Sequence, residues 1–248
     1  MSGVLVVTGA SRGIGAATAI LAGRRGYRVC VNYLHDRAAA DAVVKSIVDA
    51  GGTAIAVPAD VSRGDEVDRL FATVDDQLGT LTALVNNVGV VEKQSRVEDL
   101  TEERLHRILT TNVISAFLCC RQAVLRMSTR HGGAGGAIVN VSSAASRLGS
   151  PNEYVDYAAS KGALDTLTRG LSLEVAAEGI RVNAVRPGFI RTEFHASGGD
   201  PDRVQRLQHN LPMQRGGDPE EVAEAILWLL SDAASFSTGS FIDLAGGR

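Results

Sequence analysis

Tyr157 and Lys161 lie four residues apart in the sequence Tyr-Ala-Ala-Ser-Lys. On a helix, this spacing places the phenol and the ammonium on one face, one turn apart. A free tyrosine has a pKa of about 10, and a nearby positive charge favours the phenolate and lowers that pKa. Such a pair can transfer a proton to or from a carbonyl or alcohol oxygen. Taken alone, the spacing is more often that of an exposed pair on an ordinary helix.

A glycine-rich turn near the N-terminus is a second, independent signal. Residues 4–7 form an apolar, branched run typical of a strand buried on both faces, and residues 16–25 have helical character. Between them, Gly9, Gly13 and Gly15 have the spacing Gly-x-x-x-Gly-x-Gly. Glycines let the backbone approach a pyrophosphate, and the first free amides of the helix meet its negative charge. Strand, glycine turn and helix in this order predict a dinucleotide-binding site.

Strand and helix patterns alternate along the chain. Strands are predicted at residues 4–8, 28–33, 53–57, 83–86, 137–142, 181–185 and 240–244. The clearest helices are predicted at residues 38–50, 65–78, 102–127, 154–177 and 219–230. This alternation predicts an α/β fold, a Rossmann-like doubly wound parallel sheet of seven strands with helices on both faces and ligands at the carboxyl ends of the strands. We expect residues 1–248 to form a single domain.

Composition excludes several other classes of protein. The net charge is −3 and the basic residues are scattered, which argues against a nucleic-acid partner. We find no leader sequence and no uninterrupted apolar run long enough to span a bilayer, so we expect a cytoplasmic protein without a membrane partner. Cys30, Cys119 and Cys120 lack Cys-x-x-Cys spacing. We expect buried, reduced thiols and no metal site.

Several further motifs accompany the glycine turn and the Tyr157/Lys161 pair. They are Asp60-Val61, Asn86-Asn87-Val88-Gly89, Asn112, the serines that end residues 138–143, and residues 181–188. With these motifs, the chain resembles the short-chain dehydrogenase/reductase family, in its single-domain branch, over nearly its whole length. Val88 departs from the alanine most usual in the family's Asn-Asn-x-Gly turn, and its larger side chain is expected to tighten or shift that turn. The resemblance implies an oxidoreductase that interconverts a carbonyl and a secondary alcohol by hydride transfer.

The resemblance also implies a set of catalytic residues: Asn112, Ser143, Tyr157 and Lys161. Tyr157 would donate a proton in reduction and accept one in oxidation. Lys161 would hold the nicotinamide ribose and lower the pKa of the tyrosine, and Asn112 would position a water that links Lys161 to solvent. A serine hydroxyl would stabilise the charge that develops on the substrate oxygen. The family's spacing favours Ser143 for this role, with Ser142 as the alternative.

Cofactor contacts follow from the same resemblance. The phosphates are expected at Gly9, Ser11, Arg12, Gly13, Ile14 and Gly15. Adenine is expected at Asp60 and Val61, with Asp60 accepting a hydrogen bond from the exocyclic amine, and the adenosine ribose at Asn87 and Gly89. The nicotinamide end is expected at Tyr157, Lys161, Pro187, Gly188, Ile190 and Thr192. Asn86 and Asn183 fit a structural role as well as a functional one.

The choice of nicotinamide cofactor depends on the end of the second strand. Relatives that prefer NAD carry an acidic residue there, which holds the ribose hydroxyls and repels a 2'-phosphate. Here the strand ends with Asn32-Tyr33-Leu34 and has no acidic residue. Arg12 within the glycine turn, with His35 or Arg37, would neutralise a phosphate. The sequence therefore favours NADP, with NAD as the alternative.

Residues 191–217 carry little periodicity apart from a short helical stretch near 202–208. In the family, the corresponding segment closes over the nicotinamide and determines the substrate. Phe194 and His195 are candidates for the pocket lining, and His195 is not assigned a catalytic role. The substrate itself is not readable, because the motifs resemble those of sugar dehydrogenases and of 3-oxoacyl carrier-protein reductases alike.

Two alternatives concern activity and assembly. A protein of this fold can also be a non-catalytic dinucleotide sensor or scaffold, and the intact set of four catalytic residues argues for the enzyme. Apolar residues on more than one face of the helices at 102–127 and 154–177 predict contact with a second copy of the chain. The resemblance implies a homotetramer.

Overall fold

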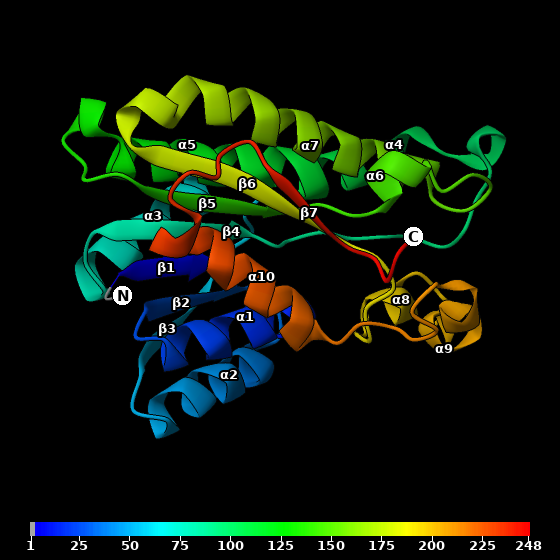
Figure 1. The fold of residues 1–248 in the computed structure, drawn as a ribbon, viewed down its shortest axis with the longest axis horizontal. Helices are drawn as coiled ribbons and strands as arrows, with labels where there is room; N and C mark the ends of the chain where they lie inside the picture. The colour runs from blue at the N-terminus through cyan, green and yellow to red at the C-terminus, as the bar shows by residue number, and fades with distance from the viewer. Residues whose placement is uncertain (1–2) are drawn as a thin grey trace.

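The computed structural model describes residues 3–248, and these residues form one parallel sheet of seven strands (Figure 1). The strands are β1 (Val4–Val7), β2 (Arg28–Tyr33), β3 (Thr53–Pro58), β4 (Leu81–Asn86), β5 (Gly136–Val141), β6 (Ile180–Pro187) and β7 (Phe241–Leu244). Their order is β3-β2-β1-β4-β5-β6-β7. The chain therefore winds outward in both directions from β1 and β4, and such a switch point creates a crevice at the carboxyl ends of the strands. The predicted fold class is confirmed.

Helices cover both faces of the sheet (Figure 1). One face carries α1 (Gly13–Arg24), α2 (Arg37–Asp49) and α10 (Pro219–Leu230), and the other carries α3 (Gly64–Gln77), α5 (Ser115–Met127) and α7 (Val155–Val175). The shorter helices are α4 (Glu102–Leu109), α6 (Ala145–Leu148), α8 (Phe194–Ser197) and α9 (Arg203–Leu207). Single 3-10 turns are formed by Val97–Asp99, Thr129–His131, Ala176–Glu178, Gln208–Asn210 and Asp232–Ala234.

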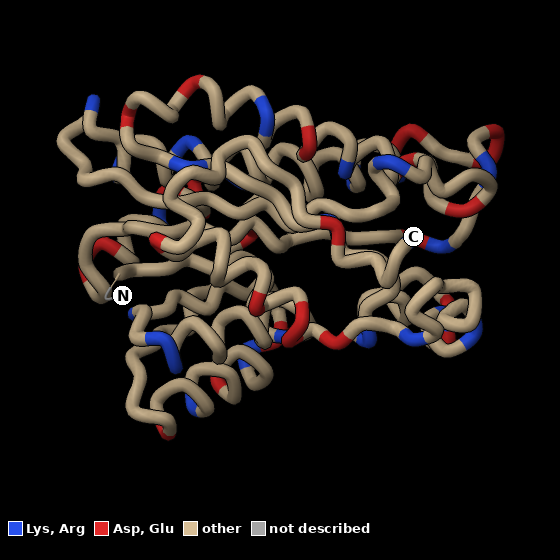
Figure 2. Tube along the Cα trace, in the orientation of Figure 1, with Lys and Arg blue, Asp and Glu red and all other residues tan. Residues whose placement is uncertain are grey.

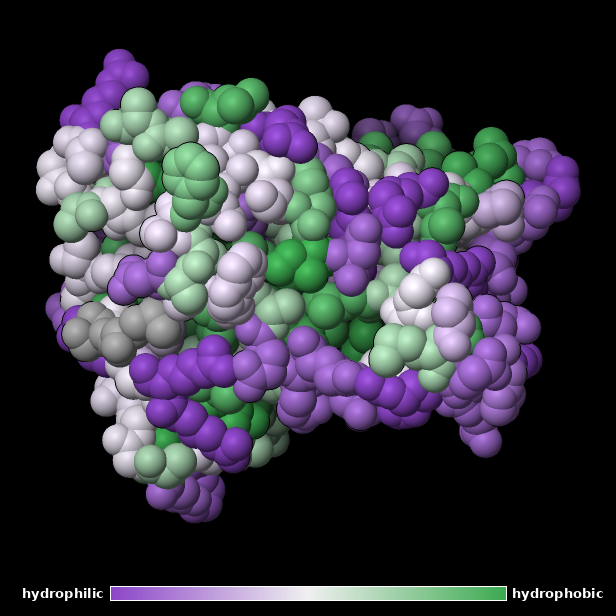
Figure 3. All heavy atoms as spheres, in the orientation of Figure 1, coloured by the Kyte–Doolittle hydropathy of each residue, from purple (hydrophilic) through white to green (hydrophobic). Residues whose placement is uncertain are grey.

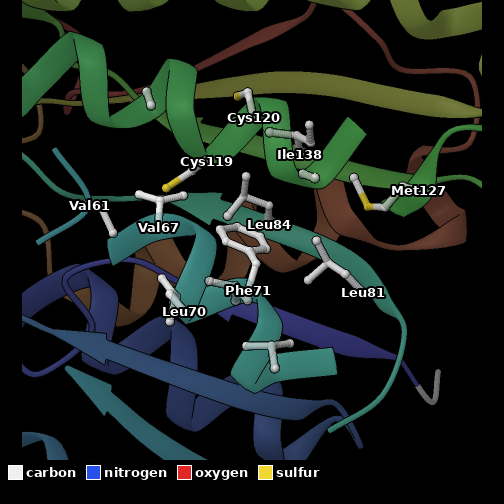
Figure 4. Packing of buried hydrophobic residues seen from close by; sticks show 14 of the residues in the cluster. Val61, Val67, Leu70, Phe71, Leu81, Leu84, Cys119, Cys120, Met127 and Ile138 are labelled. Atoms are coloured by element: carbon white, nitrogen blue, oxygen red, sulfur yellow. The ribbon is translucent and has the colours of Figure 1, made fainter. Parts of the chain in front are cut away.

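The local sequence explains where the helices begin and which side they bury. Asp218 and Glu221 form a capping box at the start of α10, with Pro219 in the first turn, where a missing N–H costs nothing. In α3, the fully buried side chains recur at helical spacing: Val67, Leu70, Phe71 and Val74. Phe71 points toward Leu84 of β4, and α5 contributes Cys119 to the same core (Figure 4). Each face of the sheet therefore has its own hydrophobic core.

The long helix predicted at residues 102–127 is interrupted. It consists of α4, a π-helical turn (Thr110–Ile114) and α5. Asn112 lies in this turn and is fully buried. A π-helical turn inserts one residue into the i to i+4 ladder and changes the direction of its side chains, and such turns are frequent at functional sites. The predicted catalytic asparagine therefore lies in the turn that interrupts the helix.

The surface and the cysteines agree with the composition. Basic and acidic residues are interspersed over the molecule (Figure 2). Cys30, Cys119 and Cys120 are buried and free of disulfides, and burial raises the pKa of each thiol. Among residues 3–248, no group of three His, Cys, Asp or Glu side chains is arranged to hold a metal ion.

One helical stretch, Glu102–Met127, is long and apolar enough by length and composition alone to cross a bilayer. Its apolar residues are interrupted by Thr110, Asn112 and Arg121, so it is not the uninterrupted apolar run that the sequence was expected to lack. Within the protein, α5 packs against β4 and α3, and its buried residues belong to the core beside Phe71. A core helix of a soluble protein passes the same test.

Candidate active site

A cavity of about 940 Å³ lies at the carboxyl ends of the strands. It extends from the glycine turn and the end of β2, past the start of α7, to the loop that follows β6. In Figure 3, hydrophobic side chains gather in the recess in the middle of the molecule, and hydrophilic side chains surround it. Fourteen of the predicted site residues line this cavity: Gly9, Ser11, Arg12, Gly13, Ile14, Asn87, Gly89, Ser143, Tyr157, Lys161, Pro187, Gly188, Ile190 and Thr192. Gly15, Asp60, Val61 and Asn112 do not line it.

The glycine turn forms a cradle for an anionic group. Gly9 and Gly13 have φ angles of +60° and +57°, a conformation that residues with a side chain rarely adopt. Arg12 at the N-cap of α1 makes no capping hydrogen bond with its side chain, and the first turn of α1 contains no acidic residue. The helix N-terminus therefore presents its amides and its positive dipole end to the cavity, which fits a pyrophosphate.

Asn87 braces this cradle from the neighbouring strand. Its side-chain amide donates hydrogen bonds to the carbonyls of Thr8 (2.9 Å) and Gly9 (3.0 Å). A Cβ atom on Gly15 would lie 2.6 Å from this amide nitrogen and from the Gly9 carbonyl oxygen. Gly15 is therefore required for the close approach of α1 to the turn. Asn87 holds the backbone of the turn at Gly9, where φ is positive.

The start of α7 brings the proton-transfer residues together. The Lys161 ammonium donates a hydrogen bond to the carbonyl of Val141 (2.8 Å) and lies 5.7 Å from the centre of the Tyr157 ring. The hydroxyl of Ser143 forms a hydrogen bond with the Tyr157 phenol. The hydroxyl of Ser142 instead donates to the backbone carbonyl of Lys161 (3.2 Å). Of the two serines, only Ser143 is therefore engaged with the tyrosine.

Burial controls the ionisation of this pair. It raises the pKa of Tyr157 to about 12, against the effect of the Ser143 hydrogen bond. It lowers the pKa of Lys161 to about 8, against the effect of the Asp165 carboxylate. Burial therefore dominates the pKa of Tyr157, and the lowering of that pKa by Lys161 stays a prediction. Desolvation penalises the charged form of both groups, and a lysine with a lowered pKa carries less positive charge near neutral pH.

Asn112 is held beside the cavity without lining it. Its side-chain oxygen accepts a hydrogen bond from the Val90 amide (2.7 Å), and its side-chain nitrogen donates to the Val90 carbonyl and to the Ser160 hydroxyl (both 3.0 Å). A Cβ atom on Gly89 would lie 3.1 Å from the Lys161 nitrogen and 3.7 Å from the Asn112 oxygen. Gly89 therefore leaves open the space between these two residues, where the predicted water would lie.

Asp60 and Val61 are not brought to the cavity with the other residues. One carboxylate oxygen of Asp60 accepts hydrogen bonds from the amide and the hydroxyl of Ser62 (3.0 and 2.7 Å). Val61 is buried in the core beside α3. The adenine contacts assigned to this pair stay predictions.

Asn86 and Asn183 have structural roles. Asn86 donates a hydrogen bond to the side chain of Asn140 (2.9 Å), which joins β4 to β5. Asn183 donates to the Ser237 carbonyl (2.8 Å) and accepts from the Ser240 amide (3.0 Å), which ties β6 to the segment before β7. These bonds satisfy polar groups that would otherwise be buried without partners.

The end of β2 lines the cavity through Tyr33, Leu34, His35 and Asp36. Asp36 is the N-cap of α2, and its carboxylate accepts a hydrogen bond from the Ala39 amide (2.9 Å). Arg12 of the glycine turn is exposed and lies 3.6 Å from Glu193 of the loop after β6. The loop therefore lies beside the glycine turn at this point.

The other end of the cavity was largely missed by reasoning from sequence. Arg203 of α9 forms ion pairs with Glu153, which precedes α7, and with Asp200. Its guanidinium lies over the rings of Tyr154 (5.1 Å) and Phe189 (5.5 Å). Arg203 and its partner Glu153 are 50 positions apart in the chain and belong to no motif. The only sequence signal was the short helical stretch near residues 202–208, which corresponds to α9.

Comparison with known proteins identifies the family. A family model described as Enoyl-(Acyl carrier protein) reductase matches residues 9–248. The chain is 62% identical over 245 residues to the oxidoreductase YgfF of Escherichia coli (strain K12), with 99% of each chain covered. It is 39% identical over 244 residues to 3beta-hydroxysteroid dehydrogenase 1 of Eggerthella lenta, with 98% of this chain and 92% of the relative covered.

One further relative and one solved structure indicate the same family. Glucose 1-dehydrogenase 2 of Bacillus subtilis is 36% identical over 242 residues, with 98% of this chain and 93% of the relative covered. A crystal structure of a short-chain type dehydrogenase/reductase from Mycobacterium marinum has a TM-score of 0.92 at 33% identity, with 98% and 94% of the two chains covered. The chain therefore belongs to the short-chain dehydrogenase/reductase family, whose members are NAD(P)-dependent oxidoreductases.

Proposed function

We propose that the protein is an NADP(H)-dependent oxidoreductase that interconverts a carbonyl and a secondary alcohol, with Tyr157 as the proton donor and acceptor. One observation carries the proposal. Ser143, Tyr157 and Lys161 line the same cavity as the glycine turn between β1 and α1. A group that can protonate an oxygen and a cradle that fits a dinucleotide thus face one common space.

The roles of the chain's own residues follow from this geometry. When bound, the nicotinamide supplies the hydride. Tyr157 delivers its proton to the substrate oxygen, and the Ser143 hydroxyl donates a hydrogen bond where negative charge develops. Below about pH 8, Lys161 is charged and stabilises the phenolate that Tyr157 leaves behind. The carbonyl of Val141 holds the ammonium in place.

The preference for NADP rests on the end of β2. Tyr33 and Leu34 line the cavity there, and the nearest carboxylate, that of Asp36, is engaged as the cap of α2. Arg12 lines the same cavity with an exposed guanidinium, whose ion pair with Glu193 is exposed and weak. A 2'-phosphate would therefore meet a cation and no free carboxylate. Titration of the protein with NADPH and NADH tests this preference, and tighter binding of NADH would contradict it.

Two arginines lie at the substrate end. Arg203 is paired with Glu153 and Asp200, whereas Arg248 lies over the ring of Phe189 (5.3 Å) and forms no ion pair among residues 3–248. The remaining walls include Leu148, Pro151 and the ring of Phe194. This apolar part of the lining favours an uncharged carbonyl compound, because an unpaired charge packed against it would be costly. The relatives named for a hydroxysteroid and for glucose act on different compounds, so their names narrow the substrate no further.

We also propose that the enzyme is a cytoplasmic homotetramer. Large apolar side chains are exposed along the α4, α5 and α7 side of the molecule: Leu105, Leu109, Ile114, Phe117, Leu125 and Leu173. Trp228 and Phe236 are exposed near β7 and would form a second contact. Such patches mark protein interfaces more often than free surface. Light scattering should give four times the mass of one chain, and the mass of one chain would contradict the proposal.

Turnover is tested with a panel of ketones, sugars and acyl thioesters, each mixed with the protein and NADPH or NADH. Absorbance of the reduced cofactor reports oxidation, and cofactor fluorescence reports binding. We expect at least one uncharged carbonyl compound to be reduced, faster with NADPH. Cofactor binding without turnover of any compound would support the non-catalytic alternative.

A further inference from the structure

His195 lies at the substrate end of the cavity, on the short helix α8. Its ring centre is 5.8 Å from that of Phe194, in an edge-to-face arrangement, and 6.2 Å from that of Phe189. Phe194 in turn lies 5.7 Å from the ring of Tyr157. The imidazole therefore packs against two aromatic rings, one of which also packs against the proposed proton donor.

The polar atoms of this imidazole are not used within the protein. Throughout residues 3–248, neither ring nitrogen of His195 takes part in a hydrogen bond or an ion pair. The side chain is partly buried against the loop and faces the cavity. Neither ring nitrogen is among the fully buried side-chain atoms without a partner, so both are accessible, and a ligand would reach them from the cavity.

The surroundings keep the imidazole uncharged. Burial and the guanidinium of Arg203 lower the pKa of His195 to about 4, against the effect of Asp200. Arg203 is itself fixed by its ion pairs with Glu153 and Asp200. A neutral imidazole has one N–H donor and one acceptor nitrogen. A hydroxyl group matches both, because it can donate to the bare nitrogen or accept from the N–H.

We propose that His195 is a specificity-determining residue that binds a hydroxyl group of an uncharged hydroxy-carbonyl substrate while the carbonyl lies at Tyr157 and Ser143. This inference rests on the proposed function and adds the substrate class. A neutral imidazole offers a carboxylate only one donor, whereas it offers a hydroxyl group both a donor and an acceptor. Phe189 and Phe194 provide the apolar walls against which the carbon skeleton packs.

The test compares cyclohexanone with 2-, 3- and 4-hydroxycyclohexanone, which differ only in the presence and position of a hydroxyl group. Dissociation constants are measured by ligand-observed NMR with bound NADP⁺ in a Tyr157→Phe background, which carries every variant below, because the intact enzyme with NADP⁺ would oxidise the hydroxyl group of these ligands. We expect at least one hydroxycyclohexanone to bind about tenfold more tightly than cyclohexanone, as for one additional hydrogen bond to a neutral group. The position of the hydroxyl group in the ligand that binds most tightly indicates the distance between the carbonyl site at Tyr157 and the hydroxyl site at His195.

Three variants assign that preference to the imidazole. His195→Gln keeps a donor and an acceptor and should retain most of the preference, whereas His195→Leu removes both and should reduce the ratio of dissociation constants to near one. His209→Leu is the matched control, because His209 is an exposed residue that follows α9 and does not line the cavity. It should keep the full preference. Thermal unfolding of each variant shows whether it is folded.

Two results would overturn the inference. The Tyr157→Phe protein with His195 intact would bind no hydroxycyclohexanone more tightly than cyclohexanone, or the addition of His195→Leu would keep the preference. Turnover is followed separately with NADPH, so that the inference and the proposed function fail in different ways. Reduction of the ketones without a hydroxyl preference overturns the role of His195 alone. A preference lost in His195→Leu without reduction of any ketone supports the hydroxyl site and contradicts the proposed reaction.

Discussion

The two halves of the cavity are built in different ways. The cofactor half is made by backbone at the ends of β1, β4 and β6, with glycines at the points of closest approach. The substrate half is made by side chains of the loop between β6 and α10 and of the segment before α7, joined by ion pairs and ring contacts such as those of Arg203. A backbone site requires particular residue types at fixed spacing, whereas a side-chain site can be assembled from many combinations.

The proton-transfer residues lie at the border between these halves. Tyr157 contacts Ser143 at the end of β5 on one side and the ring of Phe194 on the other. Lys161 is anchored to the strand-end side by the Val141 carbonyl. Substitutions at the border should therefore affect chemistry, and substitutions within one half should affect one ligand. The following predictions separate these effects, from the largest to the smallest.

Tyr157→Phe should lower kcat by a factor on the order of 10² to 10⁴, the usual range for a positioned acid or base. The ring that packs against Phe194 is retained, so NADPH affinity should change little. Steady-state kinetics and a fluorescence titration measure the two quantities. Turnover close to that of the wild type would show that Tyr157 is not the proton donor.

Ser143→Ala should lower kcat by about 10²-fold, as for the loss of one donor to a developing oxyanion. Ser142→Ala is the matched variant, since the Ser142 hydroxyl is bonded to the Lys161 backbone carbonyl and not to Tyr157. Its effect on kcat should be smaller. If Ser142→Ala is the more damaging of the two, the assignment of the serines must be reversed.

A carboxylate at the end of β2 should shift the cofactor preference from NADPH toward NADH. At an effective dielectric constant of about 20, one added charge near the 2'-phosphate changes the ratio of the two dissociation constants by about 100-fold. Tyr33→Asp gives the carboxylate the position it has in NAD-preferring relatives, but Tyr33 is buried and this variant should lose stability. Leu34→Asp is the better-tolerated companion, because Leu34 is half exposed and lines the cavity. An unchanged ratio in both variants would mean that the 2'-phosphate binds elsewhere.

Lys161 should make cofactor affinity depend on pH. The pKa of Lys161 is lowered to about 8 in the folded protein, so the ammonium is charged below that pH and neutral above it. A charge-assisted hydrogen bond to the ribose is stronger than a neutral one, so NADP⁺ affinity should fall by up to about tenfold as the pH rises through 8. Lys161→Met should bind weakly at all pH values. A pH dependence that persists in Lys161→Met would assign it to another group.

The same shift predicts a change in stability with pH. Between about pH 8 and pH 10.4, the unfolded chain binds more protons at Lys161 than the folded protein does. Below pH 8 the buried charge of Lys161 should therefore lower the free energy of unfolding by its full amount. This destabilisation should decrease as the pH rises through the window. Urea unfolding of the wild type and Lys161→Met, each followed across the window, measures the difference.

The contrast between the two halves also explains how much could be predicted from sequence. The seven-stranded parallel sheet and the cradle followed from apolar runs and glycines, because a parallel sheet and a pyrophosphate impose strict backbone requirements. The serine choice also agrees with the contact between Ser143 and Tyr157. These features depend on spacing, and spacing is visible in a single sequence.

Other features depend on side chains that only the fold brings together. The residues of the π-helical turn around Asn112 have the hydrophobic pattern of an ordinary α-helix, so the turn could not be predicted from them. The ion pair between Glu153 and Arg203 and the environment of His195 join segments that are far apart in the chain. The effect of burial on Tyr157 and Lys161 could not be predicted, because the pair spacing gives the distance between the two groups but not their burial.

Hydride transfer itself is tested most directly with NADPH that carries deuterium at the transferred position of C4. The wild type is mixed with a ketone that it reduces, and the product alcohol is analysed by NMR and mass spectrometry. We predict one deuterium per molecule on the carbinol carbon, with the hydroxyl proton derived from solvent through Tyr157. An alcohol that carries no deuterium at that carbon would contradict direct transfer from the cofactor to the carbonyl in this cavity.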